Sequence, residues 1–283
     1  MTPRLALRHL AGTPGRPLLV VGPSLGTTTD RLWGAVAHRL EGWNVLGWDL
    51  PGHGHSPAAD RLTPGFSMAV LAEAVLAAVG EAVGEDVGED VPFAYAGDSV
   101  GGAVGLRLAL DHPGRLSSLT VLCSAASFGG PDGWRDRAAL VRAEGMAPMV
   151  ASSPARWFGS AIPEERRAAA LGDLATVDPE GYARVCEALG GFDVRDRLAE
   201  VEVPLLAVAG AEDVATPPAA LAEIADGVAD GRLEVLGGVG HLAPYEAPDE
   251  VAVLLRDHLA PPAHSARSNA DSRARAASRS ASA

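Results

Sequence analysis

The sequence predicts an α/β fold in which a mostly parallel central sheet is flanked by helices and carries a helical cap between two strands. Short apolar runs recur along the chain and are continuous rather than alternating, which is typical of strands buried on both faces. Helical patterns at 63–84 and 101–113 separate several of these runs, and this βαβα order indicates parallel strands. The predicted strands are 17–22, 44–50, 92–97, 118–125, 204–210 and 232–237.

The alternation of strands and helices stops at residues 128–197, where helical patterns occur without a convincing strand. We therefore predict a core formed by residues 1–127 and 198–260, with 128–197 inserted as a cap over the carboxyl ends of the strands. Open α/β sheets bind their ligands at that edge. Residues 261–283 are rich in Ser, Arg and Ala and almost free of apolar side chains, so we expect a disordered tail there.

The composition excludes several classes of function. The chain has 283 residues, of which 47% are hydrophobic, which is enough for a large buried core. All 23 basic residues are arginine, so mechanisms that need a Schiff-base lysine or a phosphate-loop lysine are excluded. A net charge of −13 disfavours nucleic acid and anionic membranes as partners. Since the chain shows neither a membrane-length apolar run nor a leader pattern, we expect a cytoplasmic protein.

One glycine-rich stretch follows a predicted strand and opens a predicted helix. Residues 97–101 are Gly-Asp-Ser-Val-Gly, which fits the nucleophile elbow G-x-S-x-G. In that turn the backbone of Ser99 is strained, and a side chain at Gly97 or Gly101 would collide with the neighbouring strand or helix. A dinucleotide-binding G-x-G-x-x-G pattern would need glycine at the position that Ser99 occupies. We therefore predict that Ser99 is a nucleophile.

The other two members of a serine-hydrolase triad follow in the expected chain order. Hydrolases with this elbow place an acid after a later strand and a histidine near the end of the chain. Asp213 lies just beyond one predicted strand, and His241 lies just beyond the next. We expect His241 to accept the Ser99 proton, and Asp213 to orient the imidazole and stabilise its cation. The neighbouring Glu212 is the competing acid, and only analogy favours Asp213 over it.

Two backbone N–H groups are predicted to bind the oxyanion. The helix that follows Ser99 begins at Val100, whose N–H points to the place where an oxyanion would form. The second donor of such an elbow comes from a loop after an early strand, here 23–27 with the sequence PSLGT. Leu25 is the candidate donor in that loop, and Gly26 gives the loop its freedom.

The remaining histidines and cysteines do not indicate a metal site. His53 and His55 lie close together in the loop 48–57, but no third ligand accompanies them at metal spacing. Cys123 and Cys186 are far apart in the sequence, without redox or metal spacing, and we expect both to be small core residues.

Together these residues resemble the α/β-hydrolase superfamily, and finer motifs resemble its 3-oxoadipate enol-lactonases of the β-ketoadipate pathway. The elbow, the loop DLPGHGHSP and the ordered Ser, Asp and His carry the first resemblance. The second is carried by PSLGT (23–27), GDSVGGAVG (97–105), WRDR (134–137), VRAEGM (141–146), RWF (156–158), DPEGYARVCEAL (178–189) and AGAEDVATPP (209–218). The resemblance spans residues 17–258.

This resemblance implies hydrolysis of 3-oxoadipate enol-lactone to 3-oxoadipate through an acyl-enzyme on Ser99, without a metal or an organic cofactor. His241 would protonate the expelled enolate, and water would then release the diacid. Two alternatives stay open. The first is another serine hydrolase, such as a carboxylesterase, a lactonase of natural-product metabolism or a carbon–carbon bond hydrolase. The second is a non-catalytic ligand-binding protein on the same scaffold.

The implied substrate is a small anionic lactone, which needs a local cation in a protein this acidic. Arginine binds a carboxylate through two parallel hydrogen bonds. In a helix over 133–144, Trp134 and Arg137 share one face, so we predict that both contact the substrate. The alternative is that Arg137 pairs with a surface carboxylate such as Glu144.

Overall fold

The computed structural model describes residues 3–57, 66–83 and 91–259. The predicted tail at 261–283 lies outside the described residues. So do the first residues of the helix predicted over 63–84.

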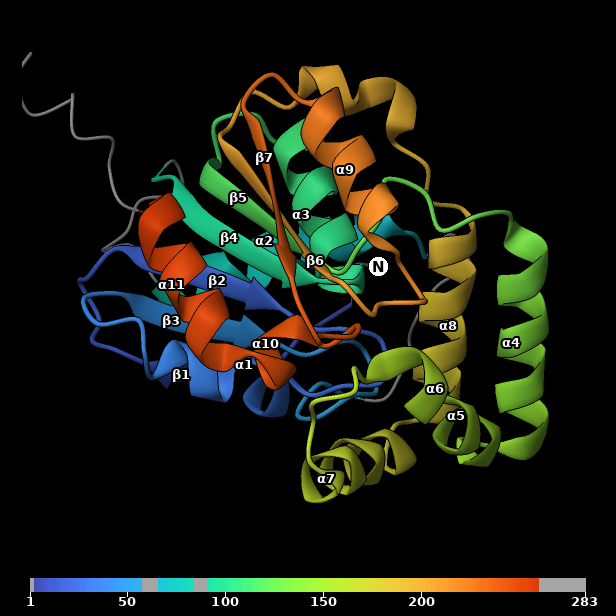
Figure 1. Cartoon of the computed structure of the whole chain (residues 1–283). Helices are drawn as coiled ribbons and strands as arrows, with labels where there is room; N and C mark the ends of the chain where they lie inside the picture. The colour runs from blue at the N-terminus through green and yellow to red at the C-terminus, as the bar shows by residue number, and fades with distance from the viewer. Residues whose placement is uncertain (1–2, 58–65, 84–90, 260–283) are drawn as a thin grey trace, which may run out of the picture.

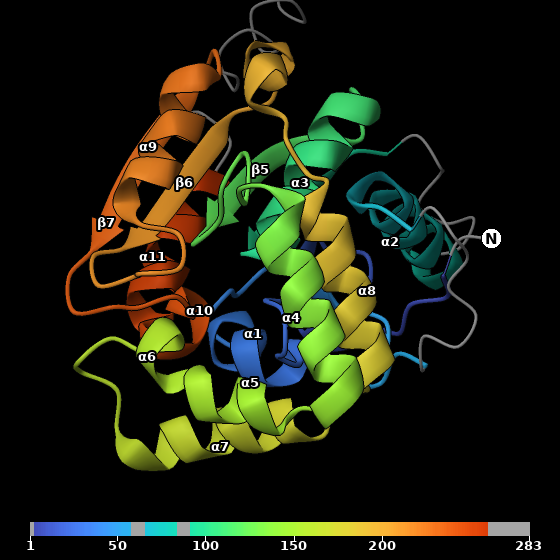
Figure 2. The ribbon, with the colours of Figure 1, turned by 90° about the vertical axis from the view of Figure 1, so that its right-hand side faces the viewer.

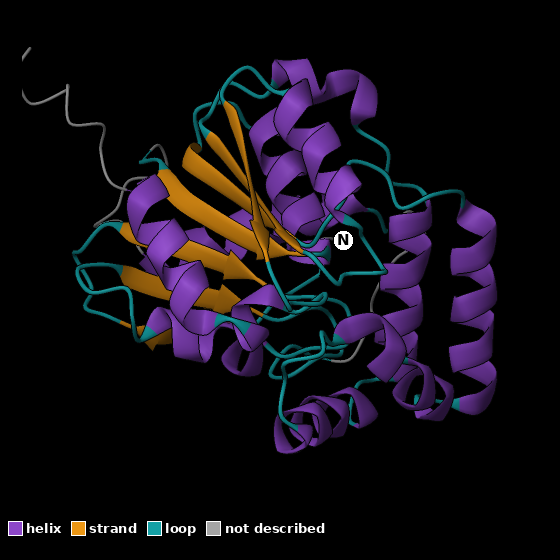
Figure 3. Ribbon diagram, viewed as in Figure 1, coloured by secondary structure: helices purple, strands orange, loops and turns teal. Residues whose placement is uncertain are grey.

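A seven-stranded sheet forms the centre of the described chain, in the order β1-β3-β2-β4-β5-β6-β7. Every neighbouring pair is parallel except β1 with β3, which is antiparallel. Figure 3 shows the resulting twisted sheet between two layers of helices. The strands are β1 (Leu7–Ala11), β2 (Leu18–Gly22), β3 (Asn44–Trp48), β4 (Phe93–Asp98), β5 (Leu116–Leu122), β6 (Leu205–Gly210) and β7 (Gly231–Leu236).

Strands β2 to β7 fall on the six predicted apolar runs, and the mostly parallel sheet is confirmed. Strand β1 was not predicted, because an edge strand has only one neighbour and its residues are only partly buried. Strand β5 ends at Leu122, before the predicted end at residue 125. The cause is Cys123, whose φ of 43° is incompatible with an extended strand.

Helices cover both faces of this sheet (Figures 1 and 3). Helices α1 and α11 pack together on one face, and α2, α3 and α9 lie on the other. These helices are α1 (Thr29–Ala37), α2 (Met68–Val83), α3 (Val100–Asp111), α9 (Pro218–Gly227) and α11 (Pro248–Leu259), with the short α10 (Ala243–Glu246) before α11. No helix among the described residues combines the length and apolarity that a bilayer crossing requires.

A helical segment is inserted between β5 and β6, as the sequence predicted. Figures 1 and 2 show its helices gathered beside the sheet, toward the carboxyl ends of the strands. It comprises α4 (Pro131–Glu144), α5 (Ala147–Ser152), α6 (Pro154–Trp157), α7 (Glu164–Ala175) and α8 (Pro179–Gly190), and a 3-10 turn at Arg195–Glu200 leads back to β6. Helices α4 and α8 pack along each other. Cys123 and Cys186, the latter on α8, are both buried free thiols.

Candidate active site

Ser99 lies in a strained turn between β4 and α3. Its φ of 53° and ψ of −110° fall outside the ordinary regions for a residue with a side chain. A Cβ on Gly97 would lie 2.1 Å from the carbonyl carbon of Gly101, and a Cβ on Gly101 would lie 2.6 Å from that of Gly22. Strand β4, helix α3 and strand β2 therefore approach as closely as the elbow interpretation predicted. The turn presents the Ser99 hydroxyl at the start of α3.

The structure brings Ser99, His241 and Asp213 together from three distant parts of the chain. The Ser99 Oγ lies 3.0 Å from Nε2 of His241, and Nδ1 of His241 lies 2.8 Å from Oδ2 of Asp213. All three residues are buried. A carboxylate can only accept here, so Nδ1 carries a proton and Nε2 is free to accept the Ser99 proton.

The Asp213 carboxylate is held in its ionised form. Burial raises the pKa of this carboxyl, but the hydrogen bond and charge of His241 and the two hydrogen bonds donated by Thr216 outweigh it, so the pKa lies below its usual value. Thr216 donates through its N–H and its hydroxyl, and the Ala215 N–H donates to the same carboxylate. Such a carboxylate can stabilise an imidazolium on His241.

Glu212, the competing acid, faces away from His241. Its carboxylate accepts hydrogen bonds from the N–H and the hydroxyl of Ser160, at 2.6 Å and 2.8 Å. The Glu212 carboxylate therefore binds the loop after α6, and the acid that contacts the imidazole is Asp213.

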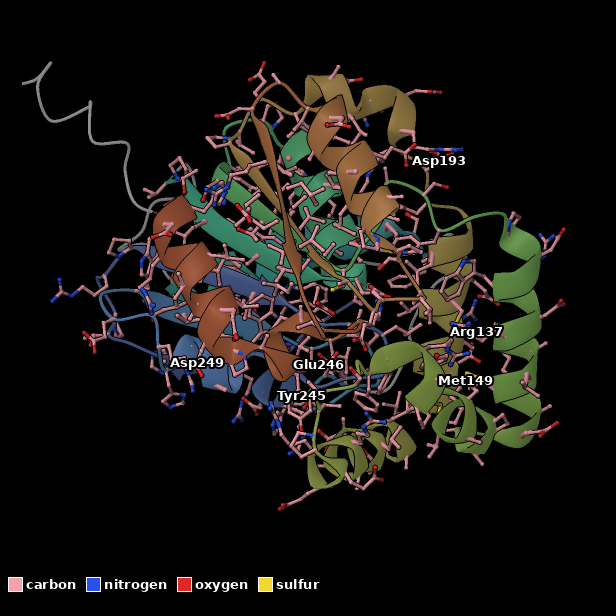
Figure 4. All side chains as sticks on the ribbon, in the orientation of Figure 1. Arg137, Met149, Asp193, Tyr245, Glu246 and Asp249 are labelled. Atoms are coloured by element: carbon pink, nitrogen blue, oxygen red, sulfur yellow. The ribbon has the colours of Figure 1, made fainter. Side chains whose placement is uncertain are left out.

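The loop that carries His241 is anchored to the helical segment. The His241 N–H donates to the carbonyl of Trp157 over 2.8 Å. Glu246, from α10, accepts from the N–H groups of Gly240 and Leu242, which flank the histidine, and from the N–H of Gly159. Figure 4 shows Glu246 at the junction of the sheet layer and the helical segment. The position of His241 therefore depends on α10 and also on the inserted helical segment, through Trp157 and Gly159.

The two predicted oxyanion donors lie beside Ser99. Val100 is the first residue of α3, where an N–H has no acceptor within the helix. Leu25 lines the same cavity as Ser99. Within the described part of the chain, no acceptor is found for either N–H group. Neither N–H is therefore occupied by an acceptor from the described residues.

A cavity of about 140 Å³ lies between the hydroxyl of Ser99 and the helical segment. Ser99 and His241 line it together with Trp134 and Arg137 of α4. The Arg137 guanidinium carbon lies 4.7 Å from the centre of the Trp134 ring. Figure 4 shows Arg137 on the side of α4 that faces α8. Among the described residues no carboxylate forms an ion pair with it, so the alternative pairing with Glu144 is wrong.

A second arginine, Arg156 of α6, lines the same cavity and was not predicted. Its guanidinium is half-buried and donates to the Ser153 hydroxyl over 3.3 Å. Burial and the positive charge of Arg137 lower the pKa of Arg156 below its usual value. One feature of the sequence could have indicated an unpaired arginine here: no Asp or Glu occurs within four positions of Arg156, so no carboxylate is close enough along a helix to pair with it. Two guanidinium groups thus face one cavity.

The two histidines of the 48–57 loop are separated. His55 is partly exposed and lies 3.4 Å from the carboxylate of Asp30 at the surface. His53 points inward, where Nε2 contacts the backbone N–H of Gly26 and Nδ1 contacts the carbonyl of Pro51. Both nitrogens of His53 are therefore engaged by the backbone.

Comparison with known proteins places this architecture in a family. The model of the alpha/beta hydrolase fold matches residues 17–248. The chain is 31% identical to 3-oxoadipate enol-lactonase 2 of Acinetobacter baylyi, over 84% of this chain and 86% of that protein. It is 27% identical to the putative carbamate hydrolase RutD of Cronobacter turicensis, over 87% of this chain and 92% of that protein. The solved enol-lactonase from Burkholderia xenovorans LB400 superposes with a TM-score of 0.79 at 30% identity, covering 90% of this chain and 96% of that one.

Proposed function

Because this chain belongs to the family of the alpha/beta hydrolase fold and is a hydrolase, we propose that it is a serine hydrolase that opens 3-oxoadipate enol-lactone to 3-oxoadipate. The observation that carries the chemistry is the pair of contacts from Ser99 Oγ to His241 Nε2 and from His241 Nδ1 to Asp213, at 3.0 Å and 2.8 Å. The similarity to enol-lactonases supports the choice of substrate.

The reaction proceeds in two halves. The Ser99 Oγ attacks the lactone carbonyl while His241 takes its proton, and the N–H groups of Leu25 and Val100 bind the oxyanion. Collapse of the tetrahedral intermediate breaks the ring C–O bond, and His241 returns the proton to the leaving enolate, which becomes the ketone. Water, deprotonated by the same imidazole, then attacks the acyl-enzyme and releases the diacid. No proton is gained or lost on the enzyme over one cycle.

The free carboxylate of the lactone binds to Arg137 and Arg156. The whole chain carries a net charge of −13, so an anionic substrate needs a local field of opposite sign. Two guanidinium groups that repel each other in a half-buried cavity supply that field, and a carboxylate between them relieves the repulsion. Residues 128–197 act as the cap that holds these arginines over Ser99.

The first test compares two substrates. We expect purified protein to hydrolyse the enol-lactone with a kcat/KM at least about 100-fold above that for p-nitrophenyl acetate, because only the lactone carries the carboxylate. Initial rates followed by absorbance measure both. A preference for the neutral ester would support a general carboxylesterase, and turnover of neither would support a binding protein or a carbamate hydrolase like the RutD relatives.

The second test removes the cations. Arg137→Ala and Arg156→Ala should each lower the ratio of kcat/KM for the anionic lactone to that for p-nitrophenyl acetate by about 10- to 150-fold, since a charged hydrogen bond contributes about 1.5–3 kcal/mol. Arg135→Ala is the matched control, because Arg135 lies on the same helix α4 but pairs with Asp132 at the surface. An unchanged ratio in both variants would place the substrate carboxylate elsewhere.

A further inference from the structure

His53 is a buried side chain that the proposed mechanism leaves unused. Its side chain is almost inaccessible, at 1% exposure, and it does not line the cavity. Its Nε2 lies 3.1 Å from the backbone nitrogen of Gly26, and its Nδ1 lies 2.9 Å from the carbonyl oxygen of Pro51. A buried histidine with a partner at each nitrogen has a defined protonation state.

The two backbone partners dictate the tautomer of His53. A carbonyl oxygen can only accept, so Nδ1 carries the proton and donates it to Pro51. A backbone N–H can only donate, so Nε2 accepts from Gly26. Burial lowers the pKa of His53 to about 4, although the charges of Asp49 and Asp178 raise it. At neutral pH the imidazole is therefore a permanent acceptor for the Gly26 N–H.

Gly26 belongs to the turn that carries a proposed oxyanion donor. The Thr27 N–H donates to the carbonyl of Ser24 over 3.1 Å, and Gly26 has a φ of 88° at the third position, which are the features of a type II turn. The peptide between Leu25 and Gly26 is the central one of this turn, and its orientation distinguishes a type II turn from a type I turn. His53 accepts a hydrogen bond from the N–H of that same peptide, which is the Gly26 N–H. The Leu25 N–H belongs to the adjacent Ser24–Leu25 peptide, which shares the Cα of Leu25.

The loop of His53 also contacts the start of helix α8. The Tyr182 ring lies 6.3 Å from the imidazole, centre to centre, with the planes 15° apart, and Tyr182 lines the cavity. The Asp178 N–H donates to the carbonyl of Gly52 over 2.9 Å. The buried His53 ring therefore lies between the turn at 24–27 and the start of α8.

From these contacts we infer that His53 is a positioning residue. Its imidazole holds the Leu25–Gly26 peptide and, through the shared Cα of Leu25, restrains the preceding Ser24–Leu25 peptide, whose Leu25 N–H is the proposed oxyanion donor. The inference rests on the proposed serine-hydrolase function. Oxyanion donors accelerate a reaction because they are oriented before charge develops. If the central peptide could rotate, Leu25 would be less restrained and its N–H, on the adjacent peptide, would be less well oriented, although the donor itself would remain.

Three single variants test this role. His53→Phe keeps a ring but removes the acceptor, whereas His53→Gln supplies an amide oxygen at about the reach of Nε2. His55→Phe is the matched control in the same loop. Within the part of the chain that the structure describes, the ion-pair partner of the His55 imidazole is the surface carboxylate of Asp30, and the His55 backbone N–H, which the substitution keeps, donates to Asp49. For each protein we would measure kcat and KM with p-nitrophenyl acetate, and the Kd of phenylboronic acid, which forms a tetrahedral adduct with the Ser99 hydroxyl.

The expected result separates orientation from folding. His53→Phe should lower kcat by about 10- to 100-fold with little change in KM, and weaken phenylboronic acid by a similar factor, because one oxyanion donor is worth about 100- to 1,000-fold. His53→Gln should recover most of both, and His55→Phe should match the wild type. A His53→Phe protein with a lower Tm but wild-type kcat and boronate affinity would overturn the inference.

Two further measurements keep the outcome decisive. If His53→Phe does not fold, His53→Asn replaces it, since its shorter amide reaches Pro51 but not Gly26. Wild-type kcat in His53→Asn would then overturn the inference. A loss of kcat of about 10- to 100-fold would support it, because it is the loss expected when one oxyanion donor is poorly oriented. Labelling of wild-type Ser99 by a fluorophosphonate tests the proposed function separately. Absence of that labelling would overturn both.

Discussion

Ser99→Ala should lower kcat for the enol-lactone by about 10⁴-fold or more, because removing the nucleophile of a triad leaves only the oxyanion donors and binding to act. The substitution should leave the fold intact, since alanine at a φ of 53° is strained to the same degree as serine. Steady-state kinetics measure the first effect, and far-UV circular dichroism with thermal unfolding checks the second.

Ser152→Ala serves as the control for Ser99→Ala. Ser152 lies on α5, and its hydroxyl donates to the backbone carbonyls of Pro148 and Met149, away from the cavity. This variant should keep the wild-type kcat and should still be labelled by a fluorophosphonate, whereas Ser99→Ala should not be labelled. Turnover of the lactone by a folded Ser99→Ala protein would exclude the acyl-enzyme mechanism.

Asp213→Asn should lower kcat by about 10⁴-fold, because an amide in place of the carboxylate favours the wrong tautomer of His241 and no longer stabilises its cation. KM should change little, since Asp213 lies behind the imidazole as seen from Ser99. Kinetics with the lactone and with p-nitrophenyl acetate should show the same loss, because both reactions need the same general base.

Glu212→Gln separates the two neighbouring acids. Glu212 bonds Ser160 rather than His241, so its amide variant should keep kcat within a few-fold of the wild type. If Glu212→Gln lost activity and Asp213→Asn kept it, the assignment of the acid would be reversed. Equal large losses would indicate that the loop after β6, rather than one carboxylate, controls the imidazole.

Much of this arrangement could be predicted from the sequence because the signals are local. Continuous apolar runs predicted strands β2 to β7, since a strand buried on both faces needs an apolar side chain at nearly every position. The elbow was predicted because a strained turn tolerates only glycine at Gly97 and Gly101, where two strands and a helix meet. The order of apolar runs along the chain predicted that Asp213 and His241 would each follow a strand, and these strands are β6 and β7.

Other parts depend on contacts between residues far apart in the chain, and these no local pattern encodes. One example is the acid that contacts His241. The Glu212 carboxylate accepts a hydrogen bond from Ser160 in the inserted segment, whereas Asp213 contacts the imidazole. Arg156 joins Arg137 only when α6 folds over the cavity.

The elbow, the chain order of Ser99, Asp213 and His241, and the sheet that aligns them all follow from the amino-acid sequence. The charges that face the cavity, and the contact of His53 with Gly26 across 27 positions, exist only in the folded chain. Local sequence sets backbone conformation through sterics and periodic burial. Hydrogen bonds and charge pairs, in contrast, depend on distances that exist only once the cap and the sheet have packed together.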